Sequence, residues 1–158
     1  MILTIPVKAY VRCFLTKFYG REPIYVRADS KLGRLFVLCF SKGLNVPIDA
    51  TDLGELQEHL EELGKREENK VVDVRFDVRF ENGLTNVTPN NLVRMSYALE
   101  AEFEKGAFFF SLGRRVFFNS EKASVKHFLQ ICDIKEDELK EDTAVKIVQR
   151  DRKKYLEG

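Results

Sequence analysis

Hydrophobic and polar residues alternate along segment 71–80. The even positions from 72 to 80 are Val or Phe, and the odd positions from 73 to 79 are Asp or Arg. Because successive side chains of a strand point to opposite faces, this pattern predicts a half-buried β-strand. The Asn82-Gly83 pair that follows favours a tight turn, with a returning strand at Leu84–Val87. We therefore expect a hairpin at about 71–88 within a small antiparallel sheet.

Most of the remaining chain shows the spacing of apolar residues that is typical of amphipathic helices. Pro6 suits the first turn of one such helix, and Ser30 is a suitable cap for the next. The expected helices cover residues 7–18, 31–42, 52–63, 89–103, 120–132 and 141–156. Short apolar runs at 2–5 and 24–27 are candidate strands, and Ile134–Leu139 fits either a brief turn or a short helix.

Segment 106–119 fits two structures, because five Phe residues flank Gly113. They suit either a helix or a tight hairpin. From Leu92 to Phe117, large and small residues alternate at intervals of four and three, which favours continuation of the preceding helix, with Gly106 as the candidate break.

These patterns predict a helix-rich α+β protein with a C-terminal three-helix segment. The 158 residues suit one domain, 1–158, with 120–158 as a candidate helical subdomain. No apolar run approaches the roughly 20 residues of a membrane helix, and the first ten residues lack the pattern of a secretory signal. Three widely spaced cysteines are expected to be reduced thiols. We therefore expect a cytoplasmic protein without a membrane segment.

Charge is divided unevenly along the chain. Residues 1–48 contain eight basic and two acidic residues, whereas residues 49–69 contain eight acidic and two basic residues. Such asymmetry is typical of a nucleic-acid surface or of a mimic of an acidic partner, and it equally fits two segments that lie side by side.

Catalytic and metal-binding motifs are not recognisable in the sequence. His59 lies among Glu55, Glu58 and Glu62 on an expected amphipathic helix, where a solvated histidine is the simplest interpretation. His127 follows Lys126, without a neighbouring acid or nucleophile. We therefore expect no enzymatic activity, no catalytic residue, no metal site and no cofactor.

The last forty residues carry the strongest functional signal. Three helical elements ending in a basic helix have the size of a helix-turn-helix unit, which suggests double-stranded DNA as a partner. The candidate nucleic-acid-binding residues are Lys146, Gln149, Arg150, Arg152, Lys153 and Lys154, helped by basic residues such as Lys8 and Arg12. Two observations weaken this interpretation: residues 121–158 contain nine basic and nine acidic residues, and cations near a helix C-terminus also complement its macrodipole.

The tail resembles that of small uncharacterised prophage and mobile-element proteins of Bacteroidetes, which end in an apolar helix, a turn and a basic helix. The likeness lies in Val125–Leu129, Ile134–Leu139 and Lys146–Tyr155, and in an opening similar to Ile5–Val11. The resemblance covers about half of the chain and implies a mobile-element setting with DNA binding, without a transferable activity.

The alternative function is a protein-interaction or assembly module without nucleic-acid binding. Its homo-oligomer interface would use the helix around Leu35–Phe40 and the residues Phe76, Phe108, Phe109 and Phe117. Antiparallel self-pairing of the strand around Phe76 would also join two copies, because Asp73 would then face Arg79.

Overall fold

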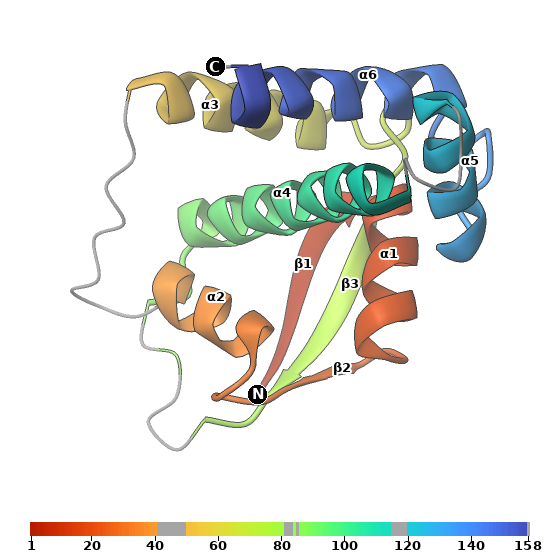
Figure 1. Cartoon of the computed structure of the whole chain (residues 1–158). Coiled ribbons are helices and arrows are strands. Elements are labelled where there is room, and N and C mark those ends of the chain that lie inside the picture. The colour runs from red at the N-terminus through yellow and green to blue at the C-terminus, as the bar shows by residue number, and fades with distance from the viewer. Residues whose placement is uncertain (41–49, 81–83, 85, 115–119, 158) are drawn as a thin grey trace. The chain divides into compact units, whose positions relative to one another are not determined.

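The computed structural model describes residues 1–40, 50–80, 84, 86–114 and 120–157. It confirms a helix-rich α+β fold with a small sheet (Figure 1). Two compact units divide inside α4, at Met1–Leu99 and Glu100–Gly158. The second unit includes the whole of the predicted subdomain 120–158 and begins before it.

The elements of the first unit alternate between strands and helices. They are β1 (Ile2–Lys8), α1 (Ala9–Tyr19), β2 (Ile24–Val26), α2 (Lys31–Phe40), α3 (Ala50–Gly64), β3 (Val71–Val78) and the first part of α4 (Pro89–Arg114). The second unit holds the rest of α4, α5 (Glu121–Ile131), α6 (Glu141–Arg152) and the π-helix η1 (Lys153–Glu157).

The predicted strand at 71–80 is confirmed as β3, but its partners differ from those expected. The sheet order is β1-β3-β2, with β1 antiparallel and β2 parallel to β3, so the sheet is mixed rather than antiparallel (Figure 1). The expected turn at Asn82-Gly83 lies outside the described residues. Leu84, Asn86 and Val87 belong to no strand, so the returning strand of the hairpin was wrongly predicted.

The central position of β3 explains why neither predicted pairing is found, the hairpin with Leu84–Val87 or the self-pairing of two copies. Phe76 is in register with Leu3 on one side and with Ile24 on the other, so both edges of β3 are occupied there. Self-pairing of two copies around Phe76 is therefore excluded. The outer strand β1 continues through Pro6 to Lys8 instead of giving way to a helix, because an edge strand tolerates the missing N–H of proline.

One face of the sheet forms the core of the first unit. The alternate residues Leu3, Ile5 and Val7 of β1 are buried, as are Val74 and Phe76 of β3. The Phe36 ring of α2 packs edge-on against Phe76, with centroids 5.1 Å apart. The opposite side chains of β3, Asp73 and Arg75, are exposed, as the alternating pattern predicts.

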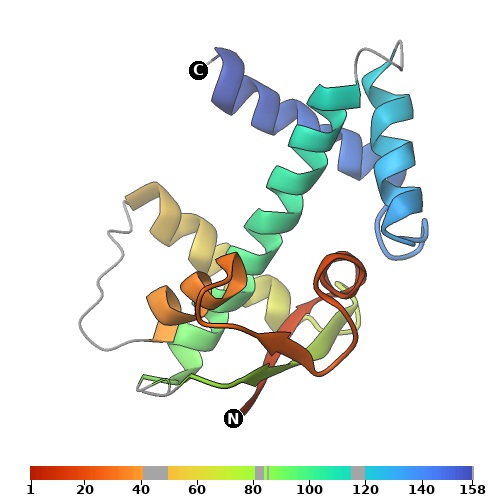
Figure 2. The same cartoon turned by 60° about the horizontal axis from the view of Figure 1, so that its bottom comes forward.

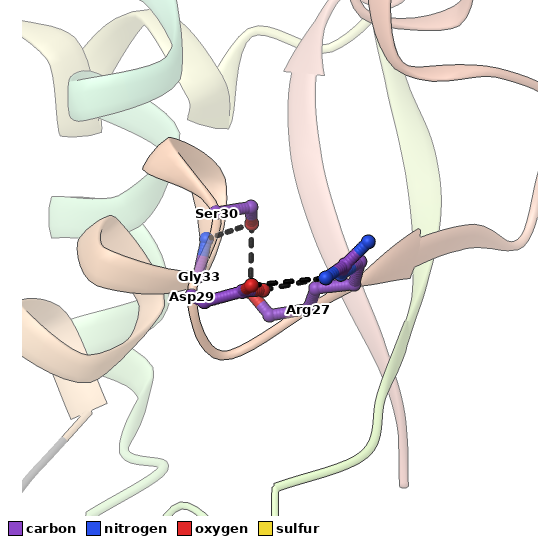
Figure 3. A network of polar contacts seen from close by, with 4 residues as sticks. All are labelled: Arg27, Asp29, Ser30 and Gly33. Atoms are coloured by element: carbon purple, nitrogen blue, oxygen red, sulfur yellow. Dashed lines mark hydrogen bonds and ion pairs between the residues drawn. The ribbon is translucent and has the colours of Figure 1, made fainter.

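The connection between β2 and α2 is held by a small polar network (Figure 3). As predicted, Ser30 caps α2: the Gly33 N–H donates to its Oγ at 2.9 Å, and this hydroxyl donates to the Arg27 carbonyl at 2.7 Å. Arg27 also pairs with Asp29 at 2.9 Å. A Cβ at Gly33 would lie 1.9 Å from the Arg27 oxygen, so this approach requires glycine.

Among the described residues, the α-helices of the second unit are the end of α4, α5 and α6. Phe128 of α5 contacts Phe103 and Phe110 of α4, with ring centroids 5.8 and 5.4 Å apart. Helix α4 runs unbroken through Gly106 to Arg114, which confirms the helical interpretation of 106–119 as far as residue 114. The rest of that segment, 115–119, lies outside the described residues.

The predicted three-helix segment differs in its middle element. Residues 134–139 form a turn, in which the N–H groups of Glu138 and Leu139 donate to the Lys135 carbonyl. The third helix of the unit is therefore contributed by α4, and α5 and α6 meet through the turn that joins them (Figure 2).

No helix in the described part of the chain is long and apolar enough to cross a bilayer. None of the three cysteines, all of them among the described residues, forms a disulfide; Cys132 is buried, and Cys13 and Cys39 are partly exposed. Burial raises the pKa of the Cys39 thiol to about 11, so it stays protonated at neutral pH.

Candidate nucleic-acid interface

Helix α6 owes its position to a short apolar stripe. Ala144 and Val148 are buried, four residues apart and thus on one side of the helix. The first turn holds Glu141 and Asp142, and the last turn holds Arg150 and Arg152. Acids at the start and cations at the end complement the helix macrodipole, so part of this charge pattern stabilises the helix itself.

A polar face lies opposite the buried stripe. Lys146, Gln149 and Lys153 are exposed at intervals of three and four residues and therefore share one side of the helix. Lys154 is also exposed, with its ammonium 5.6 Å from the Tyr155 ring centroid. We call Lys146, Gln149, Lys153 and Lys154 the α6 polar face. Within the described part of the chain, none of the three lysines forms an ion pair with an acid.

The two arginines of the predicted set have a different role. Arg150 Nη2 donates to Glu104 Oε2 of α4 at 2.6 Å. Arg152 Nη1 donates to Glu121 Oε2 of α5 at 2.5 Å, and only 31% of the Arg152 side chain is exposed. Arg152 thus fastens α6 to α5 and is a poor candidate for DNA contact, whereas Arg150 is more than half exposed.

Arg150 lies close to two carboxylates, those of Glu104 and Asp151, and the pKa of Glu104 is shifted. Burial raises the pKa of the Glu104 carboxyl to about 7; the Arg150 charge opposes the shift, while Glu100 and Asp151 reinforce it. Asp151 is itself buried and lies 3.6 Å from Arg150. The Glu104 carboxyl therefore gains or loses a proton near neutral pH, whereas Arg150 keeps its charge.

The two basic residues expected to help from the N-terminal segment are also engaged. Lys8 pairs with Glu62 at 2.6 Å, and Arg12 pairs with Glu22 at the same distance. The excess positive charge of residues 1–48 is thus partly neutralised inside the first unit, where Glu62 belongs to the acidic segment 49–69. The Lys8–Glu62 pair fits the interpretation in which the basic segment 1–48 and the acidic segment 49–69 lie side by side.

The α5–α6 pair departs from a helix-turn-helix in two respects. The connection covers residues 132–140, whereas such a motif joins its helices through roughly three or four residues. Recognition helices contact bases with their N-terminal residues, but α6 begins with Glu141 and Asp142. Any DNA contact by this helix must therefore come from its middle and its C-terminal end.

The predicted interface residues are divided by the structure. Phe76 and Phe108 are buried core residues, 0% and 2% exposed, and cannot join two copies; Phe117 lies outside the described residues. Phe109 is 59% exposed and remains a candidate. The exposed apolar side chains of the second unit, which we call the terminal apolar patch, are Phe109, Leu112, Tyr155 and Leu156.

A buried polar contact in the first unit was missed by sequence reasoning. His59 was expected to be solvated but is 4% exposed, and its Nε2 lies 2.9 Å from the Ser96 hydroxyl. Ser96 donates to the Pro6 carbonyl at 2.5 Å, so its single proton is used there and His59 donates to it. A catalytic pair needs the opposite direction, with serine donating to histidine.

The spacing of leucines along α3 does not by itself show which side chains are buried. Leu60 is 44% exposed, while His59 and Leu63 are buried. A signal was present in the sequence, because Ser96 occupies a position in the apolar spacing of α4 and a polar residue there indicates a buried hydrogen bond.

Comparisons of the chain with protein-family models, with curated proteins and with solved structures found no match.

Proposed function

We propose that this protein is a non-enzymatic module that binds double-stranded DNA through the α6 polar face, with a regulatory role in a prophage or mobile element. The observation that carries the proposal is that the cations of this helix fall into two groups, one paired with acids and one exposed to solvent. Arg152 is held by Glu121, while Lys146 and Lys153 project from the opposite face without an acidic partner in the described residues.

The chemistry of these side chains suits the DNA backbone more than the bases. Lysine ammonium groups neutralise phosphates and position a protein on the duplex without reading its sequence. Gln149 lies on the same face, and a glutamine side chain can form two hydrogen bonds with adenine. Binding of modest affinity, with strong salt dependence and weak sequence preference, follows from this composition.

Fluorescence anisotropy with a labelled duplex at about 50 mM salt tests the proposal. The Lys146→Glu, Lys153→Glu double variant should lose binding at this salt. The control is Lys126→Glu, Lys135→Glu, which makes the same change in net charge at exposed sites on α5 and the following turn. Absence of binding by the unmodified protein, or equal loss in both double variants, would count against the α6 polar face.

A second candidate is assembly of two copies through the terminal apolar patch. The observation that favours it is the position of Phe108, whose ring lies 5.2 Å from Phe109 and 5.7 Å from Tyr155, between centroids. Exposed apolar side chains next to a buried ring are a candidate surface for a two-fold contact between the same patch on two copies. Analytical ultracentrifugation of the protein and of Phe109→Ser tests it, since a concentration-independent monomer excludes this assembly.

A further inference from the structure

Arg150 combines two features that conflict with each other. Its position, one turn from Lys146 and next to Gln149, places it on the side of α6 that carries the α6 polar face. Its guanidinium nevertheless turns to Glu104 of α4, with 2.6 Å between Nη2 and Oε2. More than half of the Arg150 side chain remains exposed, so the group is accessible from solvent while its charge is compensated.

We infer that Glu104 is an autoinhibitory residue, which withholds Arg150 from phosphate until the ion pair opens. This inference rests on the proposed DNA binding. A carboxylate and a phosphate offer a guanidinium the same pair of acceptor oxygens, so the two compete for the donors of Arg150. Release of Arg150 adds a cation beside Lys146 and Lys153. While the ion pair is closed, the lysines of the α6 polar face contact phosphate without Arg150.

The surroundings of Glu104 make opening of the pair sensitive to protons. The charged groups that act on its carboxyl are Glu100 of α4 and Arg150 and Asp151 of α6. Two further carboxyl groups near the Glu104 carboxyl, those of Glu100 and Asp151, favour uptake of a proton by Glu104. Burial raises the pKa of Glu104 to about 7, and its neutral form holds Arg150 less strongly.

The substitution that tests the inference is Glu104→Gln, which keeps the shape of the side chain and removes its charge. We expect this variant to bind a DNA duplex about three- to tenfold more tightly than the unmodified protein, and its salt slope to steepen by about 0.9, the value for one added phosphate contact. The charge-matched control is Asp142→Asn on α6, the helix of Arg150, where the carboxylate is 84% exposed and lies 3.9 Å from Lys122. Asp142→Asn should increase the affinity for DNA less than Glu104→Gln does, and it should leave the salt slope of binding unchanged.

Two further measurements separate release of Arg150 from a general gain in positive charge. In an Arg150→Gln background, Glu104→Gln should increase affinity no more than Asp142→Asn does. The unmodified protein should bind DNA more tightly at about pH 6 than at about pH 8, and Glu104→Gln should lose this difference although both histidines remain. The pH comparison needs no variant and stays informative if a substitution perturbs folding.

The outcomes distinguish the two proposals. If the unmodified protein binds DNA but Glu104→Gln binds no more tightly than Asp142→Asn, the autoinhibitory role is overturned and DNA binding stands. Equal affinity of the unmodified protein at both pH values also overturns it. If neither protein binds DNA, the proposed function fails and the role of Glu104 fails with it. Binding by Glu104→Gln alone supports both.

Discussion

The imidazole of His59 and the hydroxyl of Ser96 form a buried hydrogen bond of 2.9 Å that joins α3 to α4. The Ser96 hydroxyl donates a hydrogen bond of 2.5 Å to the carbonyl of Pro6, on the outer strand of the sheet. One serine therefore connects two helices and an edge strand. Proline has no N–H, and the Pro6 carbonyl already accepts the hydrogen bond from Ser96. Pro6 therefore offers fewer backbone groups to a further strand at this edge of the sheet.

Ser96→Ala should destabilise the protein by about 2 kcal/mol, because it removes the buried hydrogen bond to His59 and the hydrogen bond to the Pro6 carbonyl. The free energy of unfolding measured with urea, by far-UV circular dichroism, checks this. A change within about 0.5 kcal/mol would mean that the contact is replaceable by water.

Ser111→Ala on the same helix should act in the opposite direction. The Ser111 hydroxyl is buried, at 2% exposure, and has no hydrogen-bond partner among the described residues. Removal of an unsatisfied polar group and the higher helix propensity of alanine should together stabilise the second unit by about 1 kcal/mol. Thermal unfolding followed by calorimetry checks this prediction, and a lower melting temperature would contradict it.

Gly33→Ala should disrupt the connection between β2 and α2. The added methyl group would lie 1.9 Å from the Arg27 oxygen, so backbone has to move at a cost of about 2 kcal/mol or more. The control is Gly54→Ala on α3, where an added Cβ would have no described atom within 4 Å apart from its own helix backbone, and alanine should stabilise by about 0.8 kcal/mol. Similar unfolding free energies for the two variants would argue against the close approach.

Stability should fall as the pH rises from about 4.5 to about 7, because Glu104 has a pKa of about 7 in the folded protein against 4.5 as its ordinary value. In this range the folded state binds more protons than the unfolded state. Glu104→Gln removes the contribution, so it should be more stable than the unmodified protein above pH 7, by on the order of 2 kcal/mol. Urea unfolding at several pH values measures it; a variant that is less stable at pH 8 would show that the ion pair outweighs burial.

The elements themselves could be predicted from local pattern. The alternation at 71–80 and the spacing across Gly106 each describe one strand or one helix, and both were confirmed. Which strands pair with β3 depends on contacts between residues far apart in sequence, such as Leu3 with Phe76. A strong local turn signal at Asn82-Gly83 therefore gave a wrong partner for β3.

The candidate site shows the same limit. Helical spacing located the basic face of α6, but the roles of its cations depend on acids of other helices. Arg150 meets Glu104, 46 residues away, and Arg152 meets Glu121, 31 residues away. On α3, spacing alone could not decide whether His59 or Leu60 points inward, because neighbouring positions fit an apolar stripe about equally well.

The salt dependence of DNA binding tests the central claim most directly. The slope of the logarithm of the binding constant against the logarithm of salt concentration reports the phosphates that a protein neutralises, at about 0.9 for each. The unmodified protein should bind a duplex at low salt, and Lys146→Gln, Lys153→Gln should reduce the slope by about 1.8, the value for two phosphate contacts. An unchanged slope in the double variant, or no binding by the unmodified protein at low salt, would contradict the α6 polar face as a DNA-binding surface.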